Sequence, residues 1–270
     1  VLARHGWLAA DATGENPRTR AVPVLEGEDE FFAVYDDVQR LESFHALAHH
    51  PDVMTAMRAA VGDSAFPHPL SVARIAFPRN EEATTPPHQD FPNNQGTDAL
   101  FACWIPLMNC PRELGGLAIL PGSHKLGLMS LEYSLGAGGR QAVLSEEALS
   151  IPWHTADFRV GDLLIFGSLT IHTALPNRSG DRFRLSVDYR YQCEGQPLTP
   201  RVLEPHFARL SWEEIYADWE SEDLKYYWRN KRYEIVPWDE TAHDLDPSHM
   251  REALRQMRAY NARREQLKED

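Results

Sequence analysis

The sequence lacks the features that mark several large classes of protein. Its three cysteines are too few and too irregularly spaced for a disulfide framework or a thiolate zinc site. No segment approaches the roughly 20 consecutive apolar residues that a membrane helix needs. The first residues, VLARHGWLAA, have no cationic start before an apolar stretch. These absences predict a cytoplasmic protein with no membrane partner.

Positive charge is scarce as well. The chain has 27 lysines and arginines against 40 aspartates and glutamates, so its formal net charge is -13. Binding to phosphate backbones or anionic lipid requires a net or localised positive field. The balance therefore predicts a small-molecule partner rather than nucleic acid. Nothing in the sequence indicates an oligomeric state.

The hydrophobic residues, 43% of the 270, are enough for one substantial core. Residues 27–62 carry apolar side chains at helical spacing and predict a helical lead-in. Residues 70–192 change to short apolar or alternating runs between proline, glycine and asparagine, which predicts an antiparallel β core. Residues 210–270 return to charged, aromatic-rich segments that predict helices against this core. We expect residues 1–270 to form a single domain.

The segment TTPPHQDFPNNQGT, residues 84–97, contains the first two candidate metal ligands. His88 and Asp90 are two residues apart, so on an extended chain both side chains point to the same side. His172 ends the apolar run LLIFGSLTIH and is the best candidate for a third ligand. Two histidines and one carboxylate form the facial triad that leaves positions open on Fe(II).

Each part of this pattern is weak alone. His50-Pro51-Asp52 has the same spacing of histidine and aspartate, but it falls between helical segments, where Asp52 is better explained as a helix N-cap. A single histidine after an apolar strand, such as His172, is often only a hydrogen-bonded core residue. The joint setting of the three candidate ligands is what favours a metal site.

The segment RFRLSVDYRYQ, residues 182–192, places polar and apolar side chains on opposite faces of a predicted strand. Arg184, Ser186, Asp188 and Arg190 share one face. A buried arginine needs a carboxylate partner, and a dicarboxylate such as 2-oxoglutarate supplies one, with the Ser186 hydroxyl as an additional donor. An internal aspartate or glutamate is the alternative partner.

Taken together, these segments make the sequence resemble the phytanoyl-CoA dioxygenase family of Fe(II)- and 2-oxoglutarate-dependent oxygenases. The resemblance spans roughly residues 28–192. Its pieces occur in the order His88-Gln89-Asp90, Trp104, Gly115-Gly116-Leu117, Pro121-Gly122-Ser123-His124, Gly161-Asp162, His172, Pro176-Asn177 and the arginine strand. The resemblance implies a mainly β fold, a double-stranded β-helix (cupin-like jelly roll) with helices at both ends.

The resemblance also implies roles for individual residues. His88, Asp90 and His172 match the iron ligands and are the catalytic residues it implies. Arg184 matches the arginine that binds the distal carboxylate of 2-oxoglutarate, and Trp104 matches an aromatic residue that lines the co-substrate pocket. The implied cofactors are Fe(II), 2-oxoglutarate as co-substrate, and O2.

One departure concerns the arginine. Arg182 and Arg184 fall on either side of the family's usual spacing from His172. We prefer Arg184, because it shares a strand face with Ser186, and Arg182 stays an alternative.

The implied reaction is hydroxylation, or another oxidation, of an unactivated C–H bond in a small molecule, as in secondary metabolism. The intact carboxylate of Asp90 argues against the related halogenases, which have a small residue there. Substrate contacts are expected among residues that flank the ligands or share the arginine face: Gln89, Phe91, Asn93, Thr97, Trp153, Asp188 and Arg190.

Two other interpretations stay open at this point. One is a non-catalytic jelly-roll protein that binds a ligand or another metal such as zinc. The other is a nucleic-acid demethylase, because Arg184 and Arg190 have the spacing of that group's arginine strand, although the net charge of -13 opposes it.

Overall fold

The computed structural model of the chain describes residues 1–243 and 250–269. Its α-helices are α1 (Asp29–Gln39), α2 (Glu42–Ala46), α3 (Pro51–Val61), α4 (Phe91–Asn94), α5 (Glu146–Ser150), α6 (Trp212–Tyr216) and α7 (Met250–Glu269). Its strands are β1 (Ala65–Pro67), β2 (Val72–Ala76), β3 (Phe101–Pro106), β4 (Leu117–Ile119), β5 (Leu131–Tyr133), β6 (Arg140–Ala142), β7 (Leu164–Gly167), β8 (His172–Ala174), β9 (Arg184–Cys193), β10 (Pro197–Leu198) and β11 (Glu234–Ile235).

Strand β9 is the centre of a five-stranded antiparallel sheet. It pairs with β3 along one edge and with β1 and β2 along the other, and β7 lies beyond β3. The register sets Ala76 opposite Arg184 and Trp104 opposite Asp188. The long alternating segment seen in the sequence is therefore the central strand of the sheet.

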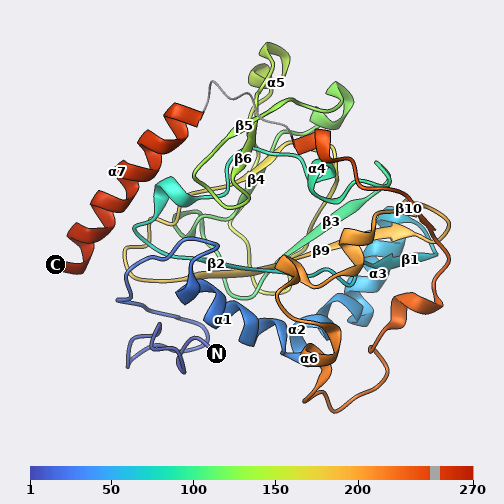
Figure 1. Cartoon of the computed structure of the whole chain (residues 1–270), viewed down its shortest axis with the longest axis horizontal. Coiled ribbons are helices and arrows are strands. Elements are labelled where there is room, and N and C mark those ends of the chain that lie inside the picture. The colour runs from blue at the N-terminus through green and yellow to red at the C-terminus, as the bar shows by residue number, and fades with distance from the viewer. Residues whose placement is uncertain (244–249, 270) are drawn as a thin grey trace.

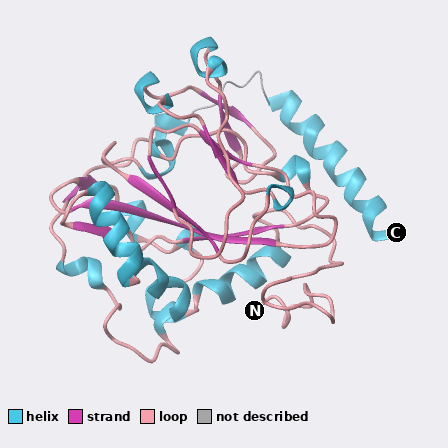
Figure 2. Cartoon of the chain, turned by 180° about the vertical axis from the view of Figure 1, so that it is seen from behind, coloured by secondary structure: helices cyan, strands magenta, loops and turns pink. Residues whose placement is uncertain are grey.

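The smaller pairs β4–β8 and β5–β6 lie across from this sheet (Figure 1). Magenta strands gather at the centre of the molecule, with the helices around them (Figure 2). The predicted mainly β core is confirmed, and the arrangement is that of a double-stranded β-helix. One turn between strands depends on glycine: at Gly115, with φ of 74°, a Cβ atom would lie 2.1 Å from the carbonyl oxygen of Leu175.

The predicted helical lead-in over 27–62 is confirmed as α1, α2 and α3. Their apolar side chains, among them Phe31, Tyr35 and Met57, pack against Val187 and other residues on the outer face of β9. The Tyr191 hydroxyl donates to the carbonyl of Ala48 at 2.7 Å, which fixes the helices to the strand. The apolar face of β9 is thus covered, and its polar face points into the β core.

One capping prediction was wrong. The residue at the N-cap of α3 is His50, whose Nδ1 accepts from the backbone N–H of Asp52, and Asp52 lies in the first turn. The reason is Pro51, which occupies the first helical position and needs no hydrogen-bond acceptor.

The C-terminal prediction was right only in part. Helix α7 is long, but most of the region from 210 to 243 forms turns and helices of five residues or fewer. Four tryptophan and tyrosine side chains there, Trp212, Tyr216, Trp219 and Trp228, pack on one another and fold the segment back on itself. The Trp219 indole donates to the carbonyl of Arg40, so this cluster contacts the helical lead-in. Among the described residues, no helix is long and apolar enough to span a bilayer.

Buried histidines make the fold sensitive to acid. Burial lowers the pKa of His45, His49 and His68 to about 4 in each case. The unfolded chain takes up protons on these rings below pH ~6.5, whereas the folded chain does so only near pH 4. The stability that comes from keeping them neutral is therefore complete at pH 7.5 and is lost as the pH falls between these values.

We expect the His49→Phe variant to lose less stability than the wild type between pH 7.5 and pH 5, by about 1 to 2 kcal/mol. Phenylalanine keeps the ring contact with Tyr227 and removes the titrating group. Urea unfolding at both pH values measures the difference. The matched control is His124→Phe at the surface, and an equal pH dependence in wild type and His49→Phe contradicts the assignment.

Candidate active site

Two segments far apart in the sequence meet through their backbones at His88 and His172. The His88 N–H donates to the His172 carbonyl at 2.9 Å, and the His172 N–H donates to the His88 carbonyl at 3.0 Å. His172 begins β8, and His88 lies in the loop before α4. The predicted ligands are therefore brought together by strand-like pairing.

The orientation of each imidazole is fixed by one hydrogen bond. The Nδ1 atom of His88 is 2.8 Å from the carbonyl of Pro86, and Nδ1 of His172 is 3.0 Å from the carbonyl of Thr170. Because a carbonyl only accepts, both Nδ1 atoms carry the proton, and both Nε2 atoms present a lone pair. Burial lowers the pKa of His88 to about 3 and also lowers that of His172, so both rings stay neutral and able to bind a metal.

Both Nε2 atoms face the same carboxylate oxygen. Each lies 3.9 Å from Oδ1 of Asp90, and one ligand atom from each of the three residues lies within 4.8 Å of the others. The second oxygen of Asp90, Oδ2, is buried and has no hydrogen-bond partner among the described residues. An unpaired buried carboxylate oxygen is costly, and a cation between the three side chains would satisfy it.

Arg190 lines the same cavity as His88 and Asp90, which agrees with its prediction as a substrate contact. Its Nη2 also donates to Oδ1 of Asp90 at 2.7 Å in a buried ion pair, a partner that the sequence did not predict. Burial raises the pKa of Asp90, but the positive charge and the hydrogen bond of Arg190 act against it, and the pKa lies well below its usual range. Asp90 is therefore ionised, and Arg190 holds it in place.

Arg184 is the predicted anchor for 2-oxoglutarate, and it is buried on the cavity wall. Its Nη1 donates to the Ser186 hydroxyl at 2.7 Å, and its Nε has no partner among the described residues. No ion pair to Arg184 occurs in residues 1–243 and 250–269, and burial lowers its pKa. Arg182, the alternative, instead pairs with Glu113 near the surface.

Trp104 does not line the cavity as expected. It is fully buried, and its indole Nε1 donates to the Ser186 hydroxyl at 2.9 Å. Ser186 thus accepts from Trp104 and Arg184 together, so Trp104 acts on the site by holding the serine.

Two of the three metal-ligand candidates, His88 and Asp90, line a cavity of about 910 Å³. Gln89 and Asn93 line it as predicted. The carboxamide of Gln89 is engaged with the backbone, because its Nε2 donates to the carbonyls of Gly127 and Leu169 and its Oε1 accepts from the N–H of Met129.

The other predicted substrate contacts do not line this cavity: Phe91, Thr97, Trp153 and Asp188. Thr97 bonds Gln196, Asp188 forms an ion pair with Arg74, and Trp153 is 40% exposed on the surface. A position near the ligand candidates in the sequence, or on the arginine face of β9, is therefore not enough to place a side chain in the cavity.

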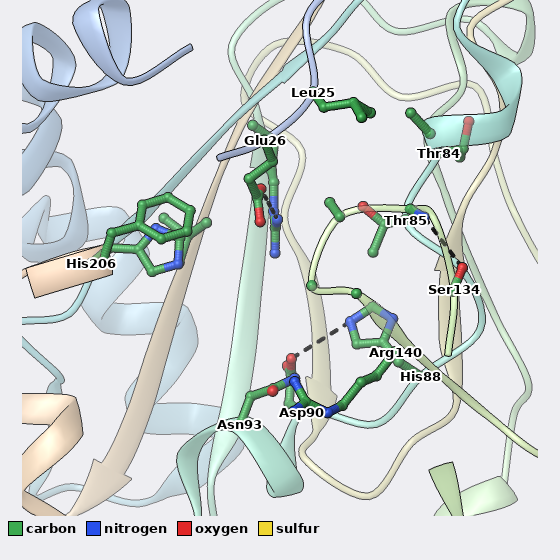
Figure 3. A pocket seen from close by; sticks show the side chains of 18 of the residues that line it. Leu25, Glu26, Thr84, Thr85, His88, Asp90, Asn93, Ser134, Arg140 and His206 are labelled. Carbon is green, nitrogen blue, oxygen red and sulfur yellow. Dashed lines mark hydrogen bonds and ion pairs between the residues drawn. The ribbon is translucent and has the colours of Figure 1, made fainter. Parts of the chain in front are cut away.

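Several cavity residues were missed from the sequence. Figure 3 shows Glu26, Arg140 and His206 around the same space as His88 and Asp90. They come from a loop before α1, from β6 and from a turn after β10. No motif or periodicity joins these positions, so no pattern in the sequence could have grouped them.

A sequence profile of the phytanoyl-CoA dioxygenase family matches residues 11–186, which is more than half of the chain. The chain belongs to this family. It is accordingly an oxygenase of the class that uses Fe(II), 2-oxoglutarate and O2, and the geometry of the three ligand candidates agrees with that class.

This oxygenase is 30% identical over 199 residues to 1-deoxypentalenic acid 11-beta-hydroxylase of Streptomyces arenae, covering 68% of each chain. It is 27% identical to the enzyme of the same name from Streptomyces exfoliatus, covering 64% of each. A crystal structure of the epimerase SnoN with Fe3+, alpha ketoglutarate and nogalamycin RO is similar in fold, with a TM-score of 0.50 and 23% identity. That alignment covers 61% of this chain and 64% of the other.

The Arg190–Asp90 pair predicts a large effect of a single substitution. We expect Arg190→Met to lower the free energy of unfolding by about 3 to 5 kcal/mol, because it leaves a buried carboxylate without its countercharge. The measurement is urea unfolding in the presence of a chelator. Arg182→Met removes the more exposed pair with Glu113 and serves as control, with an expected loss below about 1 kcal/mol. Equal losses in the two variants contradict the pairing.

Proposed function

We propose that His88, Asp90 and His172 hold Fe(II) and that Arg184 binds the distal carboxylate of 2-oxoglutarate. The observation that carries this proposal is the convergence of three ligand atoms within 4.8 Å on a cavity that also contains a buried arginine with no ion pair in the described chain. The donor set suits iron, since two imidazoles and one carboxylate leave coordination positions open for a co-substrate and oxygen.

When bound, Fe(II) and 2-oxoglutarate would activate O2 for the oxidation of a C–H bond of the substrate. The protein holds the side chains of the site in position. The carbonyls of Pro86 and Thr170 set the imidazole orientation, and Arg190 keeps Asp90 ionised and fixed. Ser186, held by Trp104, directs the guanidinium of Arg184.

The substrate we propose is a small, largely apolar metabolite. Apolar side chains make up much of the cavity wall, and they include Leu25, Phe31, Ile75, Leu131 and Met257. Two members of the family with related sequences are hydroxylases of 1-deoxypentalenic acid, and this acid is the first compound to test. Asn93, whose side chain lines the cavity beside Asp90, is the contact that we retain from the sequence.

The cofactor assignment can be tested without the substrate. In anaerobic protein with Fe(II) and 2-oxoglutarate, we expect a weak visible charge-transfer band that His172→Ala abolishes and Arg184→Ala shifts to at least tenfold higher 2-oxoglutarate concentration, as expected for loss of a charged hydrogen bond of about 1.5 to 3 kcal/mol. Arg182→Ala, with its side chain directed at Glu113, is the control and should keep the band. Folded wild type without a band would support a binding protein instead.

Turnover is tested with 1-deoxypentalenic acid and other compact fused-ring acids. We expect a product 16 mass units heavier, formed with one succinate for each 2-oxoglutarate consumed. A product with one more double bond than the substrate, or a rearranged product, would place the reaction among the other oxidations of this class. Absence of any substrate-stimulated 2-oxoglutarate consumption over the panel would contradict the proposed substrate class and leave the cofactor test unaffected.

A further inference from the structure

The cavity contains an imidazole that the iron site does not use. His206 lies in the turn between β10 and α6, beyond the last residue that the family profile matches. Its ring lines the cavity (Figure 3), with His88 and Asp90 on another side of the same space. A cavity residue outside the segment that carries the shared chemistry is well placed to distinguish substrates.

A chain of hydrogen bonds fixes which ring nitrogen of His206 carries the proton. The backbone N–H of Ala73 donates to the Tyr35 hydroxyl at 3.2 Å, and that hydroxyl is 2.6 Å from Nδ1 of His206. Tyr35 is fully buried, and burial raises the pKa of its hydroxyl, so it keeps its proton. With Ala73 as a donor to this hydroxyl, the hydroxyl hydrogen is available to Nδ1, and in that arrangement the ring proton lies on Nε2.

The ring is held neutral in this tautomer. Burial, together with the positive charges of Arg74, Arg201 and Arg190, keeps the pKa of His206 well below its usual value. Its Nε2 has no hydrogen-bond partner within residues 1–243 and 250–269. The cavity wall therefore carries a neutral N–H donor.

The backbone around His206 is strained. Phe207 and Ala208 both have positive φ, 67° and 50°, although neither is glycine. Such conformations are unfavourable for residues other than glycine and persist only where the surroundings hold them. Here the Phe207 ring packs edge-on against Phe31, Phe32 and Tyr35, which fixes the turn to α1.

We propose that Nε2–H of His206 is a specificity contact that donates a hydrogen bond to an oxygen atom of the substrate, such as a carbonyl or hydroxyl oxygen, away from the carbon that is oxidised. A neutral donor recognises an acceptor oxygen and gives no advantage to an ammonium group. The cavity then selects an apolar skeleton bearing an oxygen function. The role of His206 in substrate selection rests on the proposed function, whereas its test by binding does not require turnover.

The tautomer can be measured directly. In full-length protein labelled with ¹⁵N-histidine, we expect the His206 signal to show protonation at Nε2 alone at pH 7, and the Tyr35→Phe variant to lose that preference. His206→Gln identifies the signal by its disappearance. A ring protonated at Nδ1, or at both nitrogens, overturns the proposal.

Binding is measured with two matched probes, 1-decalone and decalin, which share a fused-ring skeleton and differ in one carbonyl. We expect the ketone to bind about tenfold more tightly than the hydrocarbon, as one hydrogen bond predicts, and to move the Nε2–H signal. His206→Leu should abolish the difference, whereas His206→Gln, whose amide can donate from the same place, should restore most of it.

Equal binding of the two probes to wild type, no saturable binding of the ketone, or an unchanged preference in His206→Leu overturns the proposal. The charge-transfer band with Fe(II) and 2-oxoglutarate is recorded on the same variants and should persist in His206→Leu. A missing band in wild type would defeat the cofactor assignment, while the probe titrations would still report on His206.

Discussion

The backbone pairing of His88 with His172 is the interaction on which the site depends. It is the middle of a short strand-like contact, in which Asp90 N–H donates to the Ser168 carbonyl and Ala174 N–H donates to the Thr85 carbonyl. The loop that carries two ligand candidates is thereby fixed to the strand that carries the third. These bonds involve only the main chain, and they bring together the two segments that carry the three ligand candidates.

The polar face of β9 imposes the second constraint. Side chains that point into the core must find partners there, since unpaired buried charges are strongly unfavourable. Asp188 pairs with Arg74 from the neighbouring strand β2, and Arg190 pairs with Asp90. Two of the three charges on this face are thus neutralised by the protein. Arg184 has no ion pair among the described residues, and it is the guanidinium that we propose for the distal carboxylate of 2-oxoglutarate.

Much of the fold and of the metal site could be predicted, because the information is local. The alternation of residues 182–192 shows both faces of β9, and the two-residue spacing of His88 and Asp90 sets their common direction. Contacts across the fold could not be predicted. The partner of Arg190 lies 100 residues away, and no alternation in the sequence distinguishes a charge that binds substrate from one that binds Asp90.

The lack of information about contacts across the fold also explains other wrong predictions. Trp153 was predicted to contact substrate, but it follows the short helix α5 and is exposed to solvent. The charged, aromatic segment after residue 210 has the composition of a helix. Its aromatic side chains instead pack against one another, and the positive φ of Tyr226, 54°, turns the chain, so no continuous helix forms. His206 has no neighbouring motif at all, and its environment is created by α1 and β2.

The uncompensated guanidinium of Arg184 has an evolutionary consequence. Replacement of a buried charge by a hydrophobic side chain of similar volume is often neutral or stabilising, so random substitution at this position has a direct route to a more stable protein. In the role that we propose, an arginine at this position trades folding stability for ligand capture. A descendant of this chain that had lost its chemistry and kept its fold would be expected to show the loss first as an aliphatic residue at position 184.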